Sequence, residues 1–172
     1  MSAATEERLI QEMAKEAVHA RLTADALGAA IHAAHTHASP ALAAATQARE
    51  NLYDRIEAEF GMLTSAQAGE AMGSRSKATR NLALNAQRQG VLLGVRRGRY
   101  TLYPGFQFDA QGVRKVIADL IAVGNRYGRT EAGLIQWLMS PTTYLGGKRP
   151  VDIIDEPDQL LAAAESSFGV EW

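Results

Sequence analysis

The stretch of sequence that decides the fold is residues 64–103, which read TSAQAGEAMGSRSKATRNLALNAQRQGVLLGVRRGRYTLY. Thr64 and Gln67 have the spacing of a capping box, in which two side chains satisfy the free backbone groups at the start of a helix. This spacing predicts a short helix, and Gly73 ends it because glycine readily adopts the left-handed conformation that closes a helix. A tight turn is therefore expected next.

A second helix and a β-hairpin follow in the same stretch. Ser76 can cap a helix over residues 77–89, and the glycine after it ends that helix. The apolar runs 91–95 and 100–103 flank the segment Arg-Arg-Gly-Arg, whose glycine suits a hairpin turn. Helix, tight turn, helix and hairpin is the order of a winged helix-turn-helix. The sequence therefore predicts a DNA-binding module of this kind at residues 62–107.

Charge is distributed unevenly along the chain of 172 residues, although its formal net charge is only −1. Residues 61–103 contain seven Lys or Arg but one Asp or Glu, which gives a net charge of +6. Residues 1–60 and 104–172 have net charges of −4 and −3. Because phosphate binding depends on local clusters of cations, the middle segment is where a polyanion would bind if the protein binds one.

The second helix of the module is expected to have an inner and an outer face. Leu82, Ala83 and Ala86 are expected to pack inward. Polar and basic side chains fall on the other side or on the hairpin tip, where they could reach bases and phosphates. These predicted DNA-binding residues are Arg75, Lys77, Arg80, Asn81, Asn85, Arg88, Arg96, Arg97 and Arg99. Alternatively, the basic face is only solvated, or the hairpin arginines pair with the acidic flanking segments.

Residues 1–61 predict a helical hairpin. Apolar residues from Ile10 to Ala34 recur at intervals of three and four, as in a heptad seam. Ser39-Pro40 then begins a second helix, and Gly61 ends it. Alanine at many seam positions buries little area, so we expect this element to need a partner surface. Homo-oligomers that form through these helices are the simplest expectation.

Residues 108–172 predict a small all-α domain, so the chain as a whole is expected to be mainly α. An apolar stripe over residues 113–121 predicts one helix, and Thr130 can cap another. Glycines and prolines between residues 141 and 150 predict a loop, and residues 158–167 predict the last helix.

This domain contains a short motif that begins at a tryptophan in a predicted helix. Its residues are Trp137-Leu138, Pro141, Leu145, the pair Gly146-Gly147, Pro150 and the aliphatic pair Ile153-Ile154. This order resembles the toxin-binding domain of the Xre/MbcA/ParS group of antitoxins over residues 108–172. The segment from Leu63 to Phe108 is similar to the helix-turn-helix that precedes the domain in some members. Thr142 departs from the asparagine of many members, and Glu156-Pro157-Asp158 replaces a turn that usually contains glycine.

The resemblance implies the antitoxin of a type II toxin-antitoxin system. Such a protein neutralises a cognate RES-type toxin, an NAD-consuming enzyme, by covering its active-site entrance. Family members also commonly dimerise and bind operator DNA to repress their own operon. Aromatic and basic residues expected at the surface are the candidate toxin-binding residues: Tyr144, Lys148, Arg149, Phe168 and Trp172. Trp137 is expected in the core.

Other functional classes have little support in the sequence. The chain has no Cys, and no nucleophile elbow, P-loop or dinucleotide motif follows a predicted strand, so we expect neither a catalytic site nor a cofactor. The histidines His19, His32, His35 and His37 lack a metal-ligand pattern, and no metal site is expected. No apolar run is long enough for a membrane span, so a cytoplasmic protein is expected. A protein-interaction adaptor that does not bind DNA and a stand-alone transcriptional regulator remain the alternatives.

Overall fold

The structure is a computed structural model that describes residues 39–73 and 79–169. The chain divides into two units, Met1–Arg49 and Glu50–Trp172. The described residues are mainly helical and include a three-stranded antiparallel sheet, which confirms the mainly α prediction. The first helix of the predicted N-terminal hairpin lies outside the described residues. Within the described ranges, no helix is long and apolar enough to cross a membrane.

Helix α2 (Pro40–Phe60) begins and ends where the sequence predicts. The backbone N–H of Leu42 donates to Oγ of Ser39 at 3.2 Å, so Ser39 caps the helix as expected. Proline at the first helical position needs no hydrogen-bond partner for its nitrogen. Within the unit 50–172, the buried residues of α2 are Leu52, Tyr53 and Ile56.

Three short strands form the sheet, β1 (Met62–Thr64), β2 (Val95–Arg97) and β3 (Tyr100–Pro104), in the order β1-β3-β2. The predicted hairpin is confirmed at β2 and β3, but residues 91–94 are not a strand. Their neighbouring leucines, Leu92 and Leu93, are both fully buried, in different hydrophobic clusters. The backbone N–H and carbonyl of Leu93 bond the side chain of Gln107 and not a neighbouring strand. Strand β1 was not predicted, because its three residues show no periodicity of their own.

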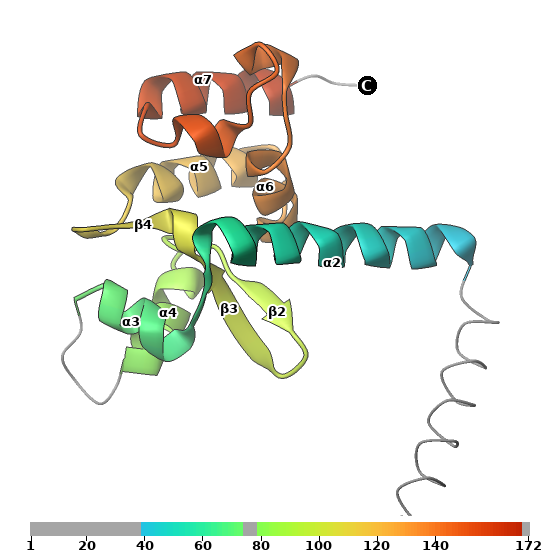
Figure 1. Cartoon of the computed structure of the whole chain (residues 1–172). Coiled ribbons are helices and arrows are strands. Elements are labelled where there is room, and N and C mark those ends of the chain that lie inside the picture. Colours follow the sequence, from blue (N-terminus) through green and yellow to red (C-terminus); the bar gives the residue numbers. More distant parts are fainter. Residues whose placement is uncertain (1–38, 74–78, 170–172) are drawn as a thin grey trace, which may run out of the picture. The chain divides into compact units, whose positions relative to one another are not determined.

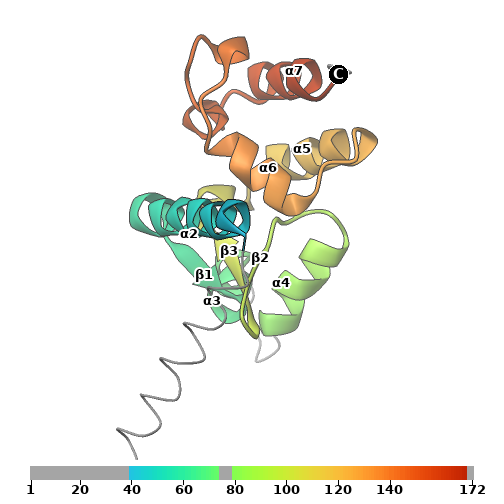
Figure 2. The same ribbon diagram turned by 90° about the vertical axis from the view of Figure 1, so that its right-hand side faces the viewer.

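Helices α3 (Ser65–Ala71) and α4 (Thr79–Arg88) pack against each other beside the sheet (Figures 1 and 2). The predicted capping box starts α3: the N–H of Gln67 donates to Oγ1 of Thr64 at 3.3 Å. In return, the N–H of Thr64 donates to Oε1 of Gln67 at 2.9 Å. The sequence rule therefore fixes the start of α3 correctly.

The inner face of α4 differs in one residue from the prediction. Ala83 and Ala86 are buried as expected, but Leu82 is 38% exposed, so its inward prediction was wrong. Close packing of α4 on α3 admits only small side chains, and Leu82 lies to one side of the alanine stripe. The alanine cluster consists of Ala68, Ala83, Ala86, Leu92 and Tyr103.

Three helices make up most of the C-terminal part, α5 (Lys115–Arg126), α6 (Glu131–Leu138) and α7 (Pro157–Phe168). They were predicted, and Thr130 caps α6 by accepting from the N–H of Gly133 at 3.1 Å. Within the unit 50–172, Figure 2 shows them on the side of α2 away from α3. Not predicted were the two-residue strands β4 (Phe108–Asp109) and β5 (Gly112–Val113) and the 3-10 turns η1 (Gly105–Gln107), η2 (Thr143–Leu145) and η3 (Pro150–Ile153).

The main hydrophobic cluster crosses the predicted boundary between residues 107 and 108. It joins apolar side chains of α5, α6 and α7 to Leu93, Val95 and Phe106 and to the buried residues of α2. The division of residues 50–172 into two modules stays a prediction, because these residues form one compact unit. The N-terminal half of this unit therefore shares its core with the C-terminal helices.

Gln107 is a fully buried polar residue that holds two segments together. Its Oε1 accepts from the N–H of Leu93 at 2.6 Å, and its Nε2 donates to the carbonyl of Leu93 at 2.9 Å and of Pro104 at 3.1 Å. A buried side-chain amide whose oxygen and nitrogen both form hydrogen bonds avoids the cost of losing its contacts with water. Gln107 thus takes the place of strand pairing for the segment before β2.

Candidate nucleic-acid interface

Helix α4 exposes three of the predicted DNA-binding side chains. Asn81, Asn85 and Arg88 are exposed, and their spacing of four and three residues places them on one face of the helix. Two amide side chains and a guanidinium are the groups that hydrogen-bond base edges and phosphates. The described residues do not include Arg75, Lys77 or the side chain of Arg80.

The β2–β3 hairpin adds two exposed arginines, Arg96 on β2 and Arg99 in the turn. The guanidinium carbon of Arg99 lies 4.9 Å from the centroid of the Tyr100 ring, and Tyr100 itself is 58% exposed. A guanidinium stacked on an exposed aromatic ring is a favourable arrangement for contacts with nucleic acid. The hairpin and α4 therefore expose basic side chains in the same part of the molecule.

Arg97 does not join these arginines. Its Nη2 lies 2.5 Å from Oε2 of Glu50 and 3.8 Å from Oδ1 of Asp54, and its Nη1 lies 3.8 Å from Oε2 of Glu57. Adjacent residues of a strand point to opposite faces, so Arg96 and Arg97 must diverge. For Arg97, the alternative of pairing with an acidic flanking segment is therefore the observed one. These three carboxylates, at intervals of four and three residues, form the acidic row of α2.

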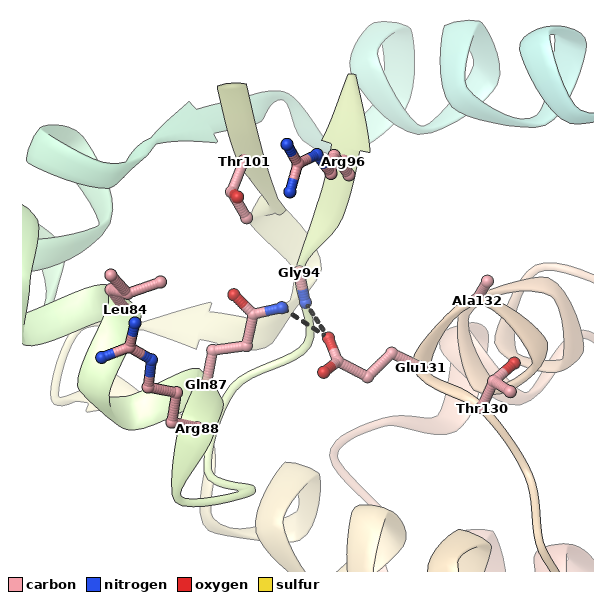
Figure 3. Close-up of a pocket in the computed structure, with 9 residues that line it drawn as sticks. All are labelled: Leu84, Gln87, Arg88, Gly94, Arg96, Thr101, Thr130, Glu131 and Ala132. Atoms are coloured by element: carbon pink, nitrogen blue, oxygen red, sulfur yellow. Dashed lines mark hydrogen bonds between the residues drawn. The ribbon is translucent and has the colours of Figure 1, made fainter. Parts of the chain in front are cut away.

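A pocket of about 540 Å³ lies between α4, the hairpin and the start of α6 (Figure 3). Leu84 and Arg88 line it from α4, and Arg96 and Thr101 line it from the hairpin. The carboxylate of Glu131, the first residue of α6, points into the pocket toward Gln87 and Gly94 in Figure 3. The pocket thus combines two guanidinium groups with one internally bonded carboxylate.

Glu131 ties α6 to the two other walls of this pocket. Its Oε2 accepts from Nε2 of Gln87 at 2.9 Å and from the backbone N–H of Gly94 at 2.8 Å. A Cβ atom at Gly94 would overlap with the side-chain amide of Gln87, so the amide can sit there only because the residue is glycine. Sequence reasoning missed Glu131 and Gln87, because nothing in their local sequence indicates a contact over 44 positions.

A second pocket of about 550 Å³ adjoins the first. It shares Leu84 and Thr101 with the first pocket, and Asn81, Arg99 and Tyr100 line its far end. The two pockets therefore meet along the space between the helix and the hairpin. We call this feature the α4–hairpin groove.

The candidate toxin-binding residues separate into exposed and packed ones. Tyr144 is 49% exposed, and Lys148 is also exposed, in the segment around the Gly-Gly pair. Phe168 was expected in an exposed tail, but it is the last residue of α7 and only 7% exposed. Its ring centroid lies 5.1 Å from that of Trp137, so it is a core residue and not a surface anchor. Trp172 lies outside the described residues.

Arg149 is held by two acidic side chains. Its Nη2 lies 2.6 Å from Oε1 of Glu59 and 2.6 Å from Oδ1 of Asp152. Hydrogen bonds from the guanidinium lower the pKa of both the Glu59 and the Asp152 carboxyls, because they favour the charged forms. Arg149 therefore joins η3 to the end of α2. Its charge is already paired with two carboxylates, so Arg149 is less available than Lys148 to bind a partner.

Metal binding has no support in the described residues. Residues 39–73 and 79–169 contain no group of three or more Asp, Glu or His that could hold a metal ion. All four histidines, His19, His32, His35 and His37, lie outside these ranges.

The chain matches no protein-family model, no curated protein and no solved structure. Its function must therefore be inferred from its own residues and from their arrangement.

Proposed function

We propose that the protein is a DNA-binding antitoxin, in which α3, α4 and the β2–β3 hairpin form a winged helix-turn-helix that represses its own operon. The C-terminal helices bind and neutralise a cognate toxin. The observation that carries the DNA-binding part is the unpaired basic surface. Arg88, Arg96 and Arg99 form no ion pair with any described residue, while Arg97 beside them forms three. Unpaired guanidinium groups are ready to exchange counterions for phosphates.

Helix α4 is suited to the major groove. It is ten residues long, it packs on α3 through small alanines, and its opposite face carries Asn81, Asn85 and Arg88. Asparagine can form two hydrogen bonds with adenine in the major groove, and arginine can bind guanine or a phosphate. In this proposal, α4 reads bases and the hairpin binds the backbone or an adjacent minor groove.

Support for a toxin partner comes from the C-terminal helices and the sequence resemblance. The apolar residues of the antitoxin-like motif, among them Leu145, Ile153 and Ile154, are buried and fix the segment that carries Tyr144 and Lys148. An exposed tyrosine beside an exposed lysine is a favourable interface anchor. The assignment of a RES-type toxin as the partner rests on the resemblance alone.

Base reading by α4 is tested with the double variant Asn81→Ala/Asn85→Ala. We expect it to lose at least about 30-fold in affinity for the duplex upstream of its own gene, because each of the two lost base contacts costs about 1–3 kcal/mol. Affinity for an unrelated duplex should hardly change. Fluorescence anisotropy at several salt concentrations measures both, with Asn125→Ala, an exposed asparagine on α5, as the matched control.

Failure of the wild-type protein to bind either duplex in a salt-dependent manner would contradict the DNA-binding part of the proposal. It would favour the adaptor alternative, in which the basic hairpin serves only internal contacts such as that of Arg97 with Glu50.

Toxin binding is tested by co-expression with the product of the adjacent gene. Wild-type protein should restore growth and co-purify with that product, and Tyr144→Ala/Lys148→Ala should reduce both while leaving duplex binding intact. Ser166→Ala, at an exposed position on α7, is the control. Full rescue by the double variant would remove these two residues from the interface. If the adjacent gene encodes a toxin of another type, the proposed RES-type partner is wrong.

A further inference from the structure

The α4–hairpin groove is the least explained part of the basic surface. A helix in the major groove and a hairpin in the adjacent minor groove are separated by one sugar-phosphate strand, because such a strand forms the wall between the two grooves of a duplex. If α4 and the hairpin bind in this way, that strand must pass between them. The two pockets that meet at Leu84 and Thr101 leave space for it at this position.

The charges in the groove suit a phosphodiester. Arg88 and Arg96 lie on opposite walls of the first pocket, and both are exposed and without an ion pair among the described residues (Figure 3). Arg99 lines the other end, in the second pocket. Among the residues that the structure describes, only one carboxylate, that of Glu131, lines the groove, and its Oε2 is already bound by Gln87 and Gly94. The groove therefore keeps an excess of positive charge.

The two residues that line both pockets suit the rest of a backbone strand. Leu84 offers an apolar surface against which deoxyribose can pack, and the hydroxyl of Thr101 can donate a hydrogen bond to a phosphate oxygen. None of these groups distinguishes one base from another. The groove thus has the chemistry of a contact that positions DNA without reading it.

We propose that one backbone strand of the bound duplex lies in the α4–hairpin groove, and that Arg88 and Arg96 hold its phosphates from the two walls. This inference rests on the proposed DNA binding and adds the place where one DNA backbone strand binds. It assigns Arg88 to a phosphate and not to a guanine, although Arg88 shares the exposed face of α4 with Asn81 and Asn85.

The salt dependence of duplex binding tests the proposal. The logarithm of the affinity falls with that of the salt concentration by about 0.9 for each phosphate bound. Arg88→Ala and Arg96→Ala should each reduce the slope by about that amount on any sequence, and the double variant by about twice as much. Lys115→Ala, which also removes one exposed positive charge, should leave the slope unchanged. Arg88→Lys and Arg96→Lys should keep the wild-type slope, because lysine also binds phosphate as a point charge.

A duplex with neutral methylphosphonate linkages, scanned along each strand, locates the contact. At one or two adjacent linkages, the substitution should weaken binding of the wild-type protein but should cost the double arginine variant nothing further. If wild-type protein binds duplex DNA but the double variant keeps the full slope, the backbone lies elsewhere and the groove proposal is wrong. If wild-type protein binds no duplex at all, both the groove proposal and the proposed DNA binding are wrong.

Discussion

Gly105→Ala is expected to lower the free energy of unfolding by more than about 3 kcal/mol, because the added methyl group has no space. A Cβ atom at this position would overlap with the carbonyl oxygen of Phe60 and lie 3.0 Å from its carbon. The N–H of Gly105 donates to the carbonyl of Gly61 at 2.9 Å, so the two backbones are held together. The contact is with backbone atoms, which cannot rotate away as a side chain can.

Urea denaturation of full-length protein measures this loss, and Gly128→Ala is its control. Gly128 has a φ of +64°, and no atom lies within 4 Å of the place that a methyl group would take, so alanine there costs only the left-handed conformation. That cost is about 1 kcal/mol. A Gly105→Ala protein as stable as Gly128→Ala would show that the end of α2 and the end of β3 do not touch.

Phe168→Ala is expected to cost about 3–5 kcal/mol, the usual range for removing a buried phenylalanine ring. The ring centroid lies 5.1 Å from that of Trp137 and 6.4 Å from that of Tyr127, and the guanidinium carbon of Arg129 lies 5.0 Å from it. Alanine would leave a cavity between α6 and α7. Thermal and urea unfolding measure the loss, and Tyr144→Ala, at a position that is 49% exposed, should change stability by less than about 0.5 kcal/mol.

Phe168→Leu separates this structural role from a role in toxin binding. Leucine restores most of the buried volume, so we expect the variant to fold and, if the protein is the proposed antitoxin, to neutralise the toxin as well as the wild-type protein does. Loss of neutralisation by a stable Phe168→Leu protein would return Phe168 to the interface.

Helix ends are the part of the fold that the sequence predicts best. Ser39, Thr64 and Thr130 each begin a helix through a hydrogen bond to a backbone N–H within the first turn. Such bonds depend only on residues three or four positions apart, so their pattern can be recognised in the sequence alone. The order of the helices and of the β2–β3 hairpin follows from the same local rules.

The contacts that position the candidate site depend on partners far along the chain. Gln107 bonds a segment 14 residues away, and Glu131 bonds residues 37 and 44 positions away. Their residue types are common at surfaces, and no spacing distinguishes them. Only the folded structure shows that these two side chains hold distant segments together, because tertiary packing determines how buried each side chain is and which groups it bonds.

Two residues of the candidate sites differ from the predicted surroundings because an element's bounds shift slightly. The sequence predicts the turn of the hairpin at residues 96–99, but β2 runs through Arg97, and strand alternation then directs Arg97 to the acidic row of α2. Likewise the sequence predicts that the last helix ends at residue 167, but α7 includes Phe168, and the Phe168 ring lies in the core. A shift of one or two residues is enough to exchange a surface role for a buried one.

The alanine cluster has a consequence for how the molecule opens. Three of its five members are alanines, so α3 and α4 bury little apolar area per residue, whereas the main cluster is rich in leucine, isoleucine and valine. Cooperative units with few buried apolar groups separate from the native structure at a lower free energy than the global transition requires. We therefore expect the backbone amide hydrogens of α3 and α4 to exchange with solvent faster than those of α5, α6 and α7.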